Sequence, residues 1–431
     1  MSERTLQVDY LARVEGEGAL KVRIDGDRVE EVELRIFEPP RFFEALLVGR
    51  DLAEAPDITA RICGICPVAY QMSACHAMEA ALGIRVDGSI RELRRLLYCG
   101  EWIESHALHI YLLHAPDFLG VPDAVALARD RPDVVRRGLA LKKVGNRILQ
   151  VLGGREVHPI NVRVGGFYRA PSREELAALR PEILRARDDA EATVRWAAAL
   201  PFPDIEEEYE FVALGPSGEY PMNEGPVVSN RGLTIPASGF EEEFLESQVP
   251  YSHALHATRR GGGTYLVGPL ARYALNFPRL SSGARSLARE VGLPPVVRNP
   301  YQSIVVRSIE VFYALEEALR VVDQYEPPDP PSVPYAPPGR TVEGAAVTEA
   351  PRGILYHRYR LAPDGRIEKA TIVPPTSQNQ KRIEEDLRHL VVRSLALDDA
   401  ALTGACERAI RNHDPCISCA THFLEVDVER R

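Results

Sequence analysis

Two short cysteine motifs near opposite ends of the sequence constrain the fold more than any other feature. The first is Cys63-Gly-Ile-Cys66, and the second is Cys416-Ile-Ser-Cys419. A spacing of two residues lets both sulfurs of a pair reach one metal ion from a single turn. Four thiolates at one point form a soft ligand set, which suits nickel, iron, zinc or copper rather than magnesium or calcium. The fold must therefore bring the two ends of the chain together.

The separation of the two pairs bears on the alternative of a structural zinc site. A zinc ribbon keeps its cysteine pairs about 15–20 residues apart, whereas almost the whole chain lies between these two. A local zinc knuckle cannot span that separation. The spacing therefore favours a buried site at the centre of a large domain over a zinc-stabilised scaffold.

The composition is that of a large acidic globular protein. The chain has 431 residues, 45% of them hydrophobic, which is enough for a sizeable core. The net charge of −10 argues against nucleic acid or an anionic membrane surface as a partner. We expect neither a membrane span nor a signal peptide, because long apolar stretches and a leader pattern are lacking. Cys75, Cys99 and Cys406 are expected to be ordinary buried thiols, a usage typical of a cytoplasmic protein.

Hydrophobic periodicity predicts a mainly helical α+β protein, with a central bundle of long helices and peripheral antiparallel hairpins. We expect one domain over residues 1–431, made of a β meander at 5–36, a helical core at 44–200, an irregular part at 201–300, a helix at 303–324, a proline-rich connector at 326–338 and a C-terminal part at 353–422. The expected helices of the core are 69–82, 90–113, 124–129, 133–152 and 172–200, the last broken at Pro181. The expected C-terminal elements are a hairpin of 355–361 and 367–373, then helices at 380–396 and 400–410. Within 201–300, strands are expected near 211–214 and 264–267.

The residues around the cysteines resemble a known family. The stretches Arg61-Ile-Cys63-Gly-Ile-Cys66-Pro and Asp414-Pro-Cys416-Ile-Ser-Cys419-Ala-Thr-His422 resemble the paired signatures of the nickel–iron hydrogenase large (alpha) subunit. Three shorter stretches resemble the same family in the same order: Arg13-Val-Glu15-Gly16, Glu349-Ala-Pro-Arg352-Gly353 and Ile372-Val-Pro374-Pro-Thr376. The motifs look most like those of the cytoplasmic, bidirectional, NAD(P)-linked branch. The resemblance implies the nickel–iron hydrogenase large-subunit fold.

The resemblance implies a nickel–iron centre held by the four cysteines. Cys63 and Cys416 would be terminal ligands of nickel, and Cys66 and Cys419 would bridge nickel and iron. The remaining ligands of the iron would be carbon monoxide and cyanide, with Thr376 donating a hydrogen bond to a cyanide. Thiolates at a metal are deprotonated.

A second metal ion is implied near the C-terminal histidine. Glu44, His422 and a backbone carbonyl near Thr371 would hold magnesium (or iron), and oxygen ligands are the kind that magnesium prefers. A plain surface acid is the alternative for Glu44. In this family the histidine normally becomes the C-terminus once a maturation protease has removed a tail. Residues 423–431 are therefore either the tail of a precursor or a segment that this member keeps.

Heterolytic cleavage of H2 needs an acceptor for hydride and a base for the proton. By resemblance, Cys416 takes the proton and passes it to Glu15, which read alone would be a solvated loop carboxylate. Partial burial can move the pKa of a carboxylate towards neutrality, as a relay requires. Arg352 would polarise H2, and Asp414 would hold Arg352 through charge-assisted hydrogen bonds.

One tyrosine and two histidines in the predicted helical core are the remaining candidates. Tyr70 stands where the family usually has a histidine, and a tyrosine hydroxyl donates a hydrogen bond but does not titrate near neutral pH. His106 and His109 share a helix face, and their spacing would permit metal binding. No third ligand accompanies them, so we interpret them as core or interface histidines.

The electron acceptor must lie on partner subunits. The chain has no spare cysteines for an iron–sulfur cluster, which implies a small subunit that carries the clusters. Arg260-Gly-Gly-Gly263 lacks the strand-to-helix context of a nucleotide site, so flavin and NAD(P) are expected on diaphorase subunits. Maturation proteins are implied as further partners. The alternatives are a hydrogenase linked to F420, ferredoxin or heterodisulfide, or a coupling subunit like the large chain of respiratory complex I, which has lost these four cysteines.

Overall fold

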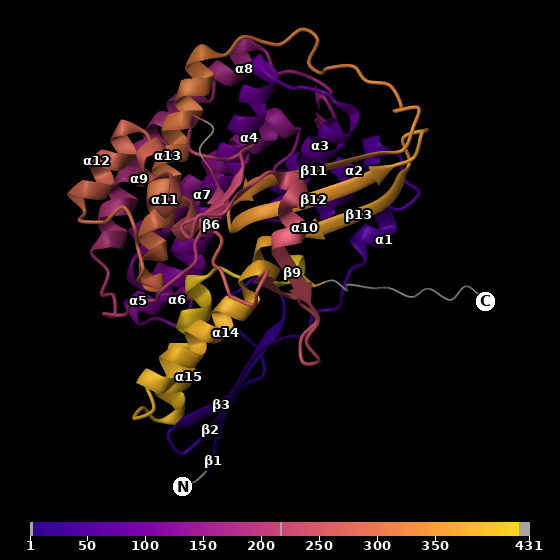
Figure 1. Ribbon diagram of the computed structural model, residues 1–431. Coiled ribbons are helices and arrows are strands. Elements are labelled where there is room, and N and C mark those ends of the chain that lie inside the picture. Colours follow the sequence, from indigo (N-terminus) through magenta and orange to yellow (C-terminus); the bar gives the residue numbers. More distant parts are fainter. Residues whose placement is uncertain (1–2, 216–217, 422–431) are drawn as a thin grey trace.

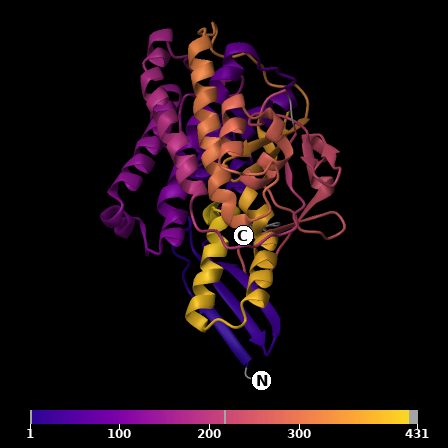
Figure 2. The same ribbon diagram turned by 90° about the vertical axis from the view of Figure 1, so that its left-hand side faces the viewer.

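The computed structural model describes residues 3–215 and 218–421. The predicted ligand His422 and the segment 423–431 lie outside the described residues. Long helices form one side of the molecule, a three-stranded sheet crosses its middle, and a second three-stranded sheet with two helices projects from one end (Figures 1 and 2). This is the expected mainly helical α+β architecture, with small antiparallel sheets around a helical core. None of the described helices combines the length and the apolar character needed to cross a membrane.

The central bundle consists of α4 (Gly88–Leu108), α7 (Pro132–Gly153), α9 (Arg180–Ala198) and α13 (Ser303–Gln324). Helices α4 and α7 approach closely because glycines face each other at the crossing. A Cβ atom added to Gly145 would lie 2.6 Å from the carbonyl oxygen of Gly100. Almost every residue of the first four turns of α13 is buried, so this helix forms the centre of the hydrophobic core.

The helix predicted at 90–113 is longer than expected and changes its pitch. It begins at Gly88 and is α-helical to Leu108, then makes a π-helical turn over His109–His114 before α5 (Ala115–Leu119). Pro116 lies in the first turn of α5. Because proline has no backbone N–H, it cannot continue the regular hydrogen-bond ladder, and π-turns often lie at functional sites.

The central sheet consists of β11 (Val342–Ala350), β12 (Gly353–Leu361) and β13 (Ile367–Val373). The predicted hairpin of β12 and β13 is confirmed, whereas β11 was not predicted. Strands β11 and β12 pair up to Ala350 and Gly353, so only Pro351 and Arg352 remain in the turn. This turn places Arg352 at the tip of a rigid hairpin.

The projecting end of the molecule is built from an N-terminal sheet and two helices that lie late in the sequence. Strands β1 (Glu3–Val8), β2 (Gly18–Asp25) and β3 (Arg28–Ile36) form the expected antiparallel meander. Helices α14 (Pro375–Arg393) and α15 (Asp399–Asn412) pack on it through one shared hydrophobic cluster. Helix α14 begins earlier than the predicted residue 380, because Pro375 is well suited to the first helical position.

The prediction that residues 201–300 are irregular is wrong in part. Two helices, α11 (Pro269–Asn276) and α12 (Ser282–Glu290), lie in this region. The strand expected near 264–267 is reduced to a single bridge between Leu266 and Phe211, while β6 (Val212–Leu214) forms where expected. The remaining strands here are β7 (Val227–Ser229), β8 (Thr234–Ile235), β9 (Phe244–Ser247) and β10 (His256–Arg259).

The remaining α-helices and strands link these parts or pack against them. The helices are α1 (Phe43–Leu47), α2 (Ala55–Thr59), α3 (Pro67–Leu82), α6 (Ala124–Asp130), α8 (Arg173–Ala177), α10 (Phe240–Glu243) and α16 (Ile417–Ala420), and the strands are β4 (Val162–Arg163) and β5 (Gly166–Phe167). The break between α8 and α9 precedes Pro181, which lies in the first turn of α9. The connector 326–338 contains no helix or strand and lies against β4 and β5, where the N–H of Val333 donates to the Gly165 carbonyl.

Candidate metal centre

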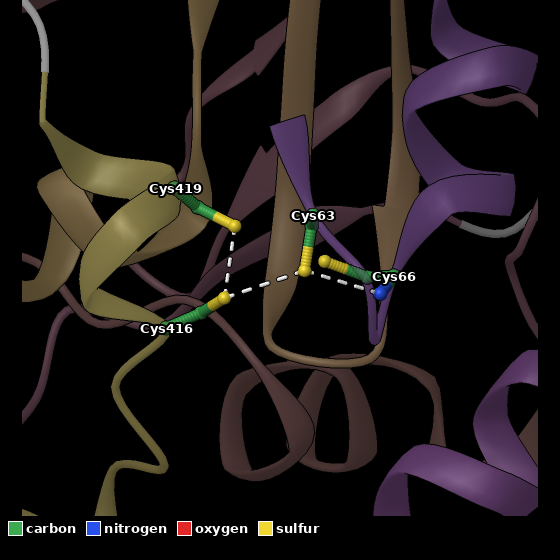
Figure 3. Close-up of side chains that lie close together, drawn as sticks. All are labelled: Cys63, Cys66, Cys416 and Cys419. Carbon is green, nitrogen blue, oxygen red and sulfur yellow. Dashed lines mark hydrogen bonds between the residues drawn. The ribbon is translucent and has the colours of Figure 1, made fainter. Parts of the chain in front are cut away.

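The four predicted cysteines converge at a buried point between the bundle and the central sheet. Their sulfur atoms all lie within 4.8 Å of one another. Cys63 Sγ lies 3.5 Å from Cys416 Sγ, which lies 2.8 Å from Cys419 Sγ. Figure 3 shows the sulfurs pointing toward one another, Cys63 and Cys66 from the segment before α3, Cys416 from the residue before α16 and Cys419 from within α16. The expected meeting of the two chain ends is therefore present.

A buried carboxylate that the sequence analysis missed holds the first pair. Cys66 directly precedes α3, and Glu101 of α4 accepts hydrogen bonds from the first N–H groups of that helix, at Val68 (2.6 Å) and Ala69 (3.1 Å). The N–H of Cys66 donates to Cys63 Sγ at 3.2 Å. No motif marks Glu101, because its contact depends on how α4 and α3 pack.

Glu15 lies against the second pair, as the family resemblance implied. Its Oε2 is 3.1 Å from Cys416 Sγ and accepts the N–H of Ser418 at 3.1 Å. The Ser418 hydroxyl donates to the other oxygen of the carboxylate. Gly16 has a φ of +91°, and a Cβ there would lie 2.7 Å from Cβ of Ile417, so only glycine fits this bend.

Arg352 and Asp414 form the predicted ion pair beside the cysteines. Arg352 Nη2 lies 3.1 Å from Asp414 Oδ1, and Arg352 Nε donates to the Asp414 carbonyl at 2.9 Å. A second buried arginine, Arg307 of α13, contacts the other carboxylate oxygen at 3.3 Å. Sequence reasoning missed Arg307, which lies in a helix without any recognisable motif. Asp414 thus holds two guanidinium groups in the protein interior.

The electrostatic surroundings shift the pKa values of Cys63 and Cys416 in opposite directions. Burial opposes ionisation of Cys63, but hydrogen bonds with the other thiols and the charge of Arg352 hold its pKa well below the ordinary value. Hydrogen bonding with the other three thiols, together with burial, raises the pKa of Cys416 well above that value. Burial would lower the pKa of Arg352, but Asp414 and the thiols raise it. Of the four thiols, Cys63 alone has a lowered pKa, and Cys416 is the one whose sulfur Glu15 contacts.

The residues around the cysteines fit a bound soft metal. Four buried thiols form the donor set, and all of them are free of disulfide bonds. The buried hydroxyl of Tyr70 has no hydrogen-bond partner within residues 3–215 and 218–421, so it could donate to a group bound at the cysteines. Thr376 Oγ1 accepts the N–H of Cys416 at 3.0 Å, which leaves its own hydrogen for a further acceptor.

Glu44, one of the predicted magnesium ligands, lies beside the Thr371–Ile372 peptide group, where its Oε1 accepts the N–H of Ile372 at 2.6 Å. Because this peptide bond is trans, the Thr371 carbonyl points away from that N–H and therefore away from Glu44. Glu44 and Cys419 line one pocket of about 350 Å³. Because His422 lies outside the described residues, the binding of magnesium or iron here stays a prediction.

The other candidates are not part of the cysteine cluster. His106 lies between Glu310 (3.0 Å) and Arg307 (3.4 Å), and His109 contacts the Arg411 carbonyl at 2.8 Å, so both are core histidines as expected. Cys75, Cys99 and Cys406 are buried and unpaired.

A second group of potential metal ligands is better explained by ion pairs. The ligand atoms of Glu207, Asp386 and His389 lie within 4.8 Å of one another. Arg382 contacts both carboxylates, and Arg393 contacts Glu207 at 2.8 Å. The arginines supply the positive charge that a metal ion would otherwise provide.

Known proteins resemble this chain over nearly its whole length. The nickel-dependent hydrogenase family matches residues 41–133 and 237–422. The alpha chain of sulfhydrogenase 2 from Pyrococcus furiosus is 33% identical over 425 residues, covering 98% of this chain and 100% of that protein. The matching chain of the F420-non-reducing hydrogenase from Methanothermobacter marburgensis is 28% identical over 97% of this chain and 95% of that protein. The crystal structure of an NAD+-reducing [NiFe]-hydrogenase in the H2-reduced state superimposes with a TM-score of 0.85 at 26% identity, over 97% of this chain and 99% of that one.

These matches agree with the cysteine geometry. The family match includes both cysteine pairs, and the sulfhydrogenase chain matches over its full length. The chain belongs to the nickel-dependent hydrogenase family.

Proposed function

We propose that this chain, as the catalytic large subunit of a nickel–iron hydrogenase, oxidises H2 reversibly in the cytoplasm and delivers the electrons through a small iron–sulfur subunit to NAD(P). The observation that carries the proposal is the convergence of four buried sulfurs, with a carboxylate against Cys416 and an arginine beside the cluster. A carboxylate in contact with a thiol can accept a proton, and a buried arginine supplies a fixed positive charge; heterolytic H2 chemistry would use both beside the bound metal centre, which would accept the hydride.

The four cysteines would hold the nickel–iron centre, with Cys63 and Cys416 on nickel, and Cys66 and Cys419 shared with iron. Such a centre supplies the heterolytic cleavage of H2 when it is bound. Carbon monoxide and cyanide on the iron, and a hydrogen bond from Thr376 to a cyanide, are part of the proposal. The free hydrogen of the Thr376 hydroxyl supports that role.

Proton transfer would run from Cys416 to Glu15. The sulfur and the carboxylate oxygen are 3.1 Å apart, which is within hydrogen-bond reach. The contacts with Ser418 hold the carboxylate in that orientation. Arg352, anchored by Asp414 at the tip of the β11–β12 hairpin, would keep a fixed positive charge over the H2 site.

The assignment of NAD(P) as acceptor rests on similarity. One structurally similar protein is an NAD+-reducing [NiFe]-hydrogenase. We therefore propose diaphorase subunits with flavin and NAD(P), and maturation proteins, as further partners. A hydrogenase with F420, ferredoxin or heterodisulfide as acceptor is the second candidate, since another relative is an F420-non-reducing hydrogenase. All four cysteines are present, which argues against a non-catalytic coupling subunit.

The decisive experiment uses protein produced with its maturation proteins and its small subunit. Metal analysis should find nickel and iron, and infrared spectroscopy should show the bands of carbon monoxide and cyanide. Zinc alone, or no diatomic bands, would reject the proposal. Copurified subunits and H2-dependent reduction of NAD(P), compared with F420 and ferredoxin, identify the acceptor.

A further inference from the structure

Asp117 forms a nearly buried bridge between two arginines from opposite ends of the chain. One carboxylate oxygen accepts from Arg13 Nη2 at 2.5 Å and from Arg411 Nη2 at 2.9 Å. The other oxygen accepts from Arg411 Nε at 2.7 Å. The side chains of Asp117 and Arg411 are only 5% and 3% exposed, so water screens these charges little. The bidentate pair fixes the plane of the Arg411 guanidinium.

Each arginine lies close in sequence to a residue of the metal centre. Arg13 precedes Glu15 by two residues, and Arg411 precedes Asp414 by three. Arg411 Nη1 also donates to the Ala12 carbonyl at 3.0 Å. The segment that carries Glu15 is therefore tied directly to the segment that carries Asp414 and Cys416.

The π-helical turn His109–His114 contacts both segments that the bridge joins. Arg13 Nη1 donates to the carbonyl of Leu113 at 2.8 Å, within the turn His109–His114. His109 Nε2 contacts the carbonyl of Arg411 at 2.8 Å. The turn thus holds both arginine-bearing segments at the start of α5, where Asp117 itself lies.

Each of the two segments joined by the bridge contains one residue with a strained backbone conformation. Arg13 has a φ of +59° and Asp414 a φ of +53°, and they are two of four non-glycine residues with positive φ among those described. Such conformations are strained and persist only where surrounding contacts over-determine them. The bridge supplies such contacts directly to Arg13, and through the Arg411 carbonyl, which accepts the N–H of Asp414 at 3.1 Å, to Asp414.

We propose that Asp117 is a positioning residue of the hydrogenase reaction, which through Arg13 and Arg411 sets the place of Glu15 against Cys416. The inference rests on the proposed role of Glu15 as proton relay. Asp117 acts through the two arginines, and its effect is to keep the 3.1 Å separation between the Glu15 carboxylate and Cys416. A displacement of about 1 Å in such a pair can lower a rate by about 100-fold.

The test uses holoenzyme produced with its maturation proteins and its small subunit. Asp117→Asn keeps the size of the side chain but removes the charge that both arginines share. We expect wild-type nickel and iron contents, a loss of H2 oxidation of about ten- to hundred-fold, and an increased solvent deuterium isotope effect, because proton transfer becomes the slow step. A purely structural role would lower the thermal midpoint and leave the isotope effect unchanged.

Glu317→Gln is the matched control. Glu317 of α13 is 11% exposed and is likewise shared by two arginines, Arg95 of α4 and Arg320 of α13. This variant should lose thermal stability while its isotope effect equals that of the wild type.

Arg13→Gln tests the bridge independently, because it removes only the more exposed arm, whose side chain is 16% exposed. If Asp117→Asn fails to take up metal, Arg13→Gln must still show the increased isotope effect. Wild-type isotope effects in Arg13→Gln, or in a metal-loaded Asp117→Asn enzyme, overturn the positioning role. A wild-type enzyme that lacks nickel or H2 oxidation refutes the proposed function and the positioning role together.

Discussion

Replacement of Asp414 by asparagine tests the buried charge arrangement beside the cysteines most directly. Asparagine tolerates the left-handed backbone of this position, so the variant removes the charge with little change in shape. Arg352 and Arg307 then lose their shared carboxylate, at 3.1 and 3.3 Å, while both remain buried. Removal of one partner from a buried ion pair costs about 3–5 kcal/mol, because the remaining charge is uncompensated.

Part of this cost should appear as stability and part as activity. In a domain of about 150–250 residues, 1 kcal/mol changes the thermal midpoint by about 2–4 °C, and by less in a larger protein. We therefore expect a fall of several degrees by calorimetry of the holoenzyme. H2 oxidation should fall by about 100-fold, because Arg352 loses the charged partner of its Nη2 and keeps only the bond from Nε to the backbone carbonyl.

A second substitution in the same ion pair supplies the control. Arg307→Met in the Asp414→Asn background removes one of the two uncompensated charges, so the double variant should regain thermal stability relative to Asp414→Asn. H2 oxidation should stay low, since Arg352 is still without its carboxylate. An Asp414→Asn enzyme with wild-type midpoint and turnover would refute the reasoning, because it would show that the carboxylate does not hold the two guanidinium groups.

Three further outcomes follow from individual contacts. Cys416→Ser should abolish H2 turnover, measured as H2-dependent dye reduction, and retained activity would contradict its proposed role as ligand and proton acceptor. Glu15→Gln should slow H/D exchange by about 10²–10⁴-fold with unchanged nickel and iron, and unaltered exchange would remove Glu15 from the relay. Burial raises the pKa of Glu384 to about 7, although the Leu34 N–H and the Tyr251 hydroxyl favour its charged form. Because the pKa of Glu384 is raised in the folded state, its protonated form favours the folded protein. This contribution to the free energy of unfolding is full below about pH 4.5 and is lost as pH rises to about 7. Glu384→Gln should therefore weaken the dependence of the thermal midpoint on pH across that range, and an identical pH profile would exclude this explanation.

Hydrophobic periodicity and the positions of prolines are sufficient to predict most of the long helices and strands. The helices at 133–152 and 303–324 follow apolar spacing, and the meander at 5–36 follows strict alternation, because these patterns depend only on neighbours in the sequence. Strand β11 was missed because its final five residues are all buried, so that alternation, which marks a half-exposed strand, is absent there. The π-helical turn was missed because its pitch change depends on the packing around His109–His114.

The sequence by itself determined which atoms are available for chemistry: two spaced cysteine pairs, the Glu15–Gly16 bend, and an arginine before a hairpin. Only the tertiary structure decided that Glu101 would hold the start of α3, that Arg307 would share Asp414 with Arg352, and that Asp117 would bridge Arg13 and Arg411. The physical reason is that spacing along a chain specifies local ligand pairs, whereas a buried charge is stable only beside partners that distant elements bring to it. Those partners carry no local pattern, and the packing of the bundle against the two chain ends selects them.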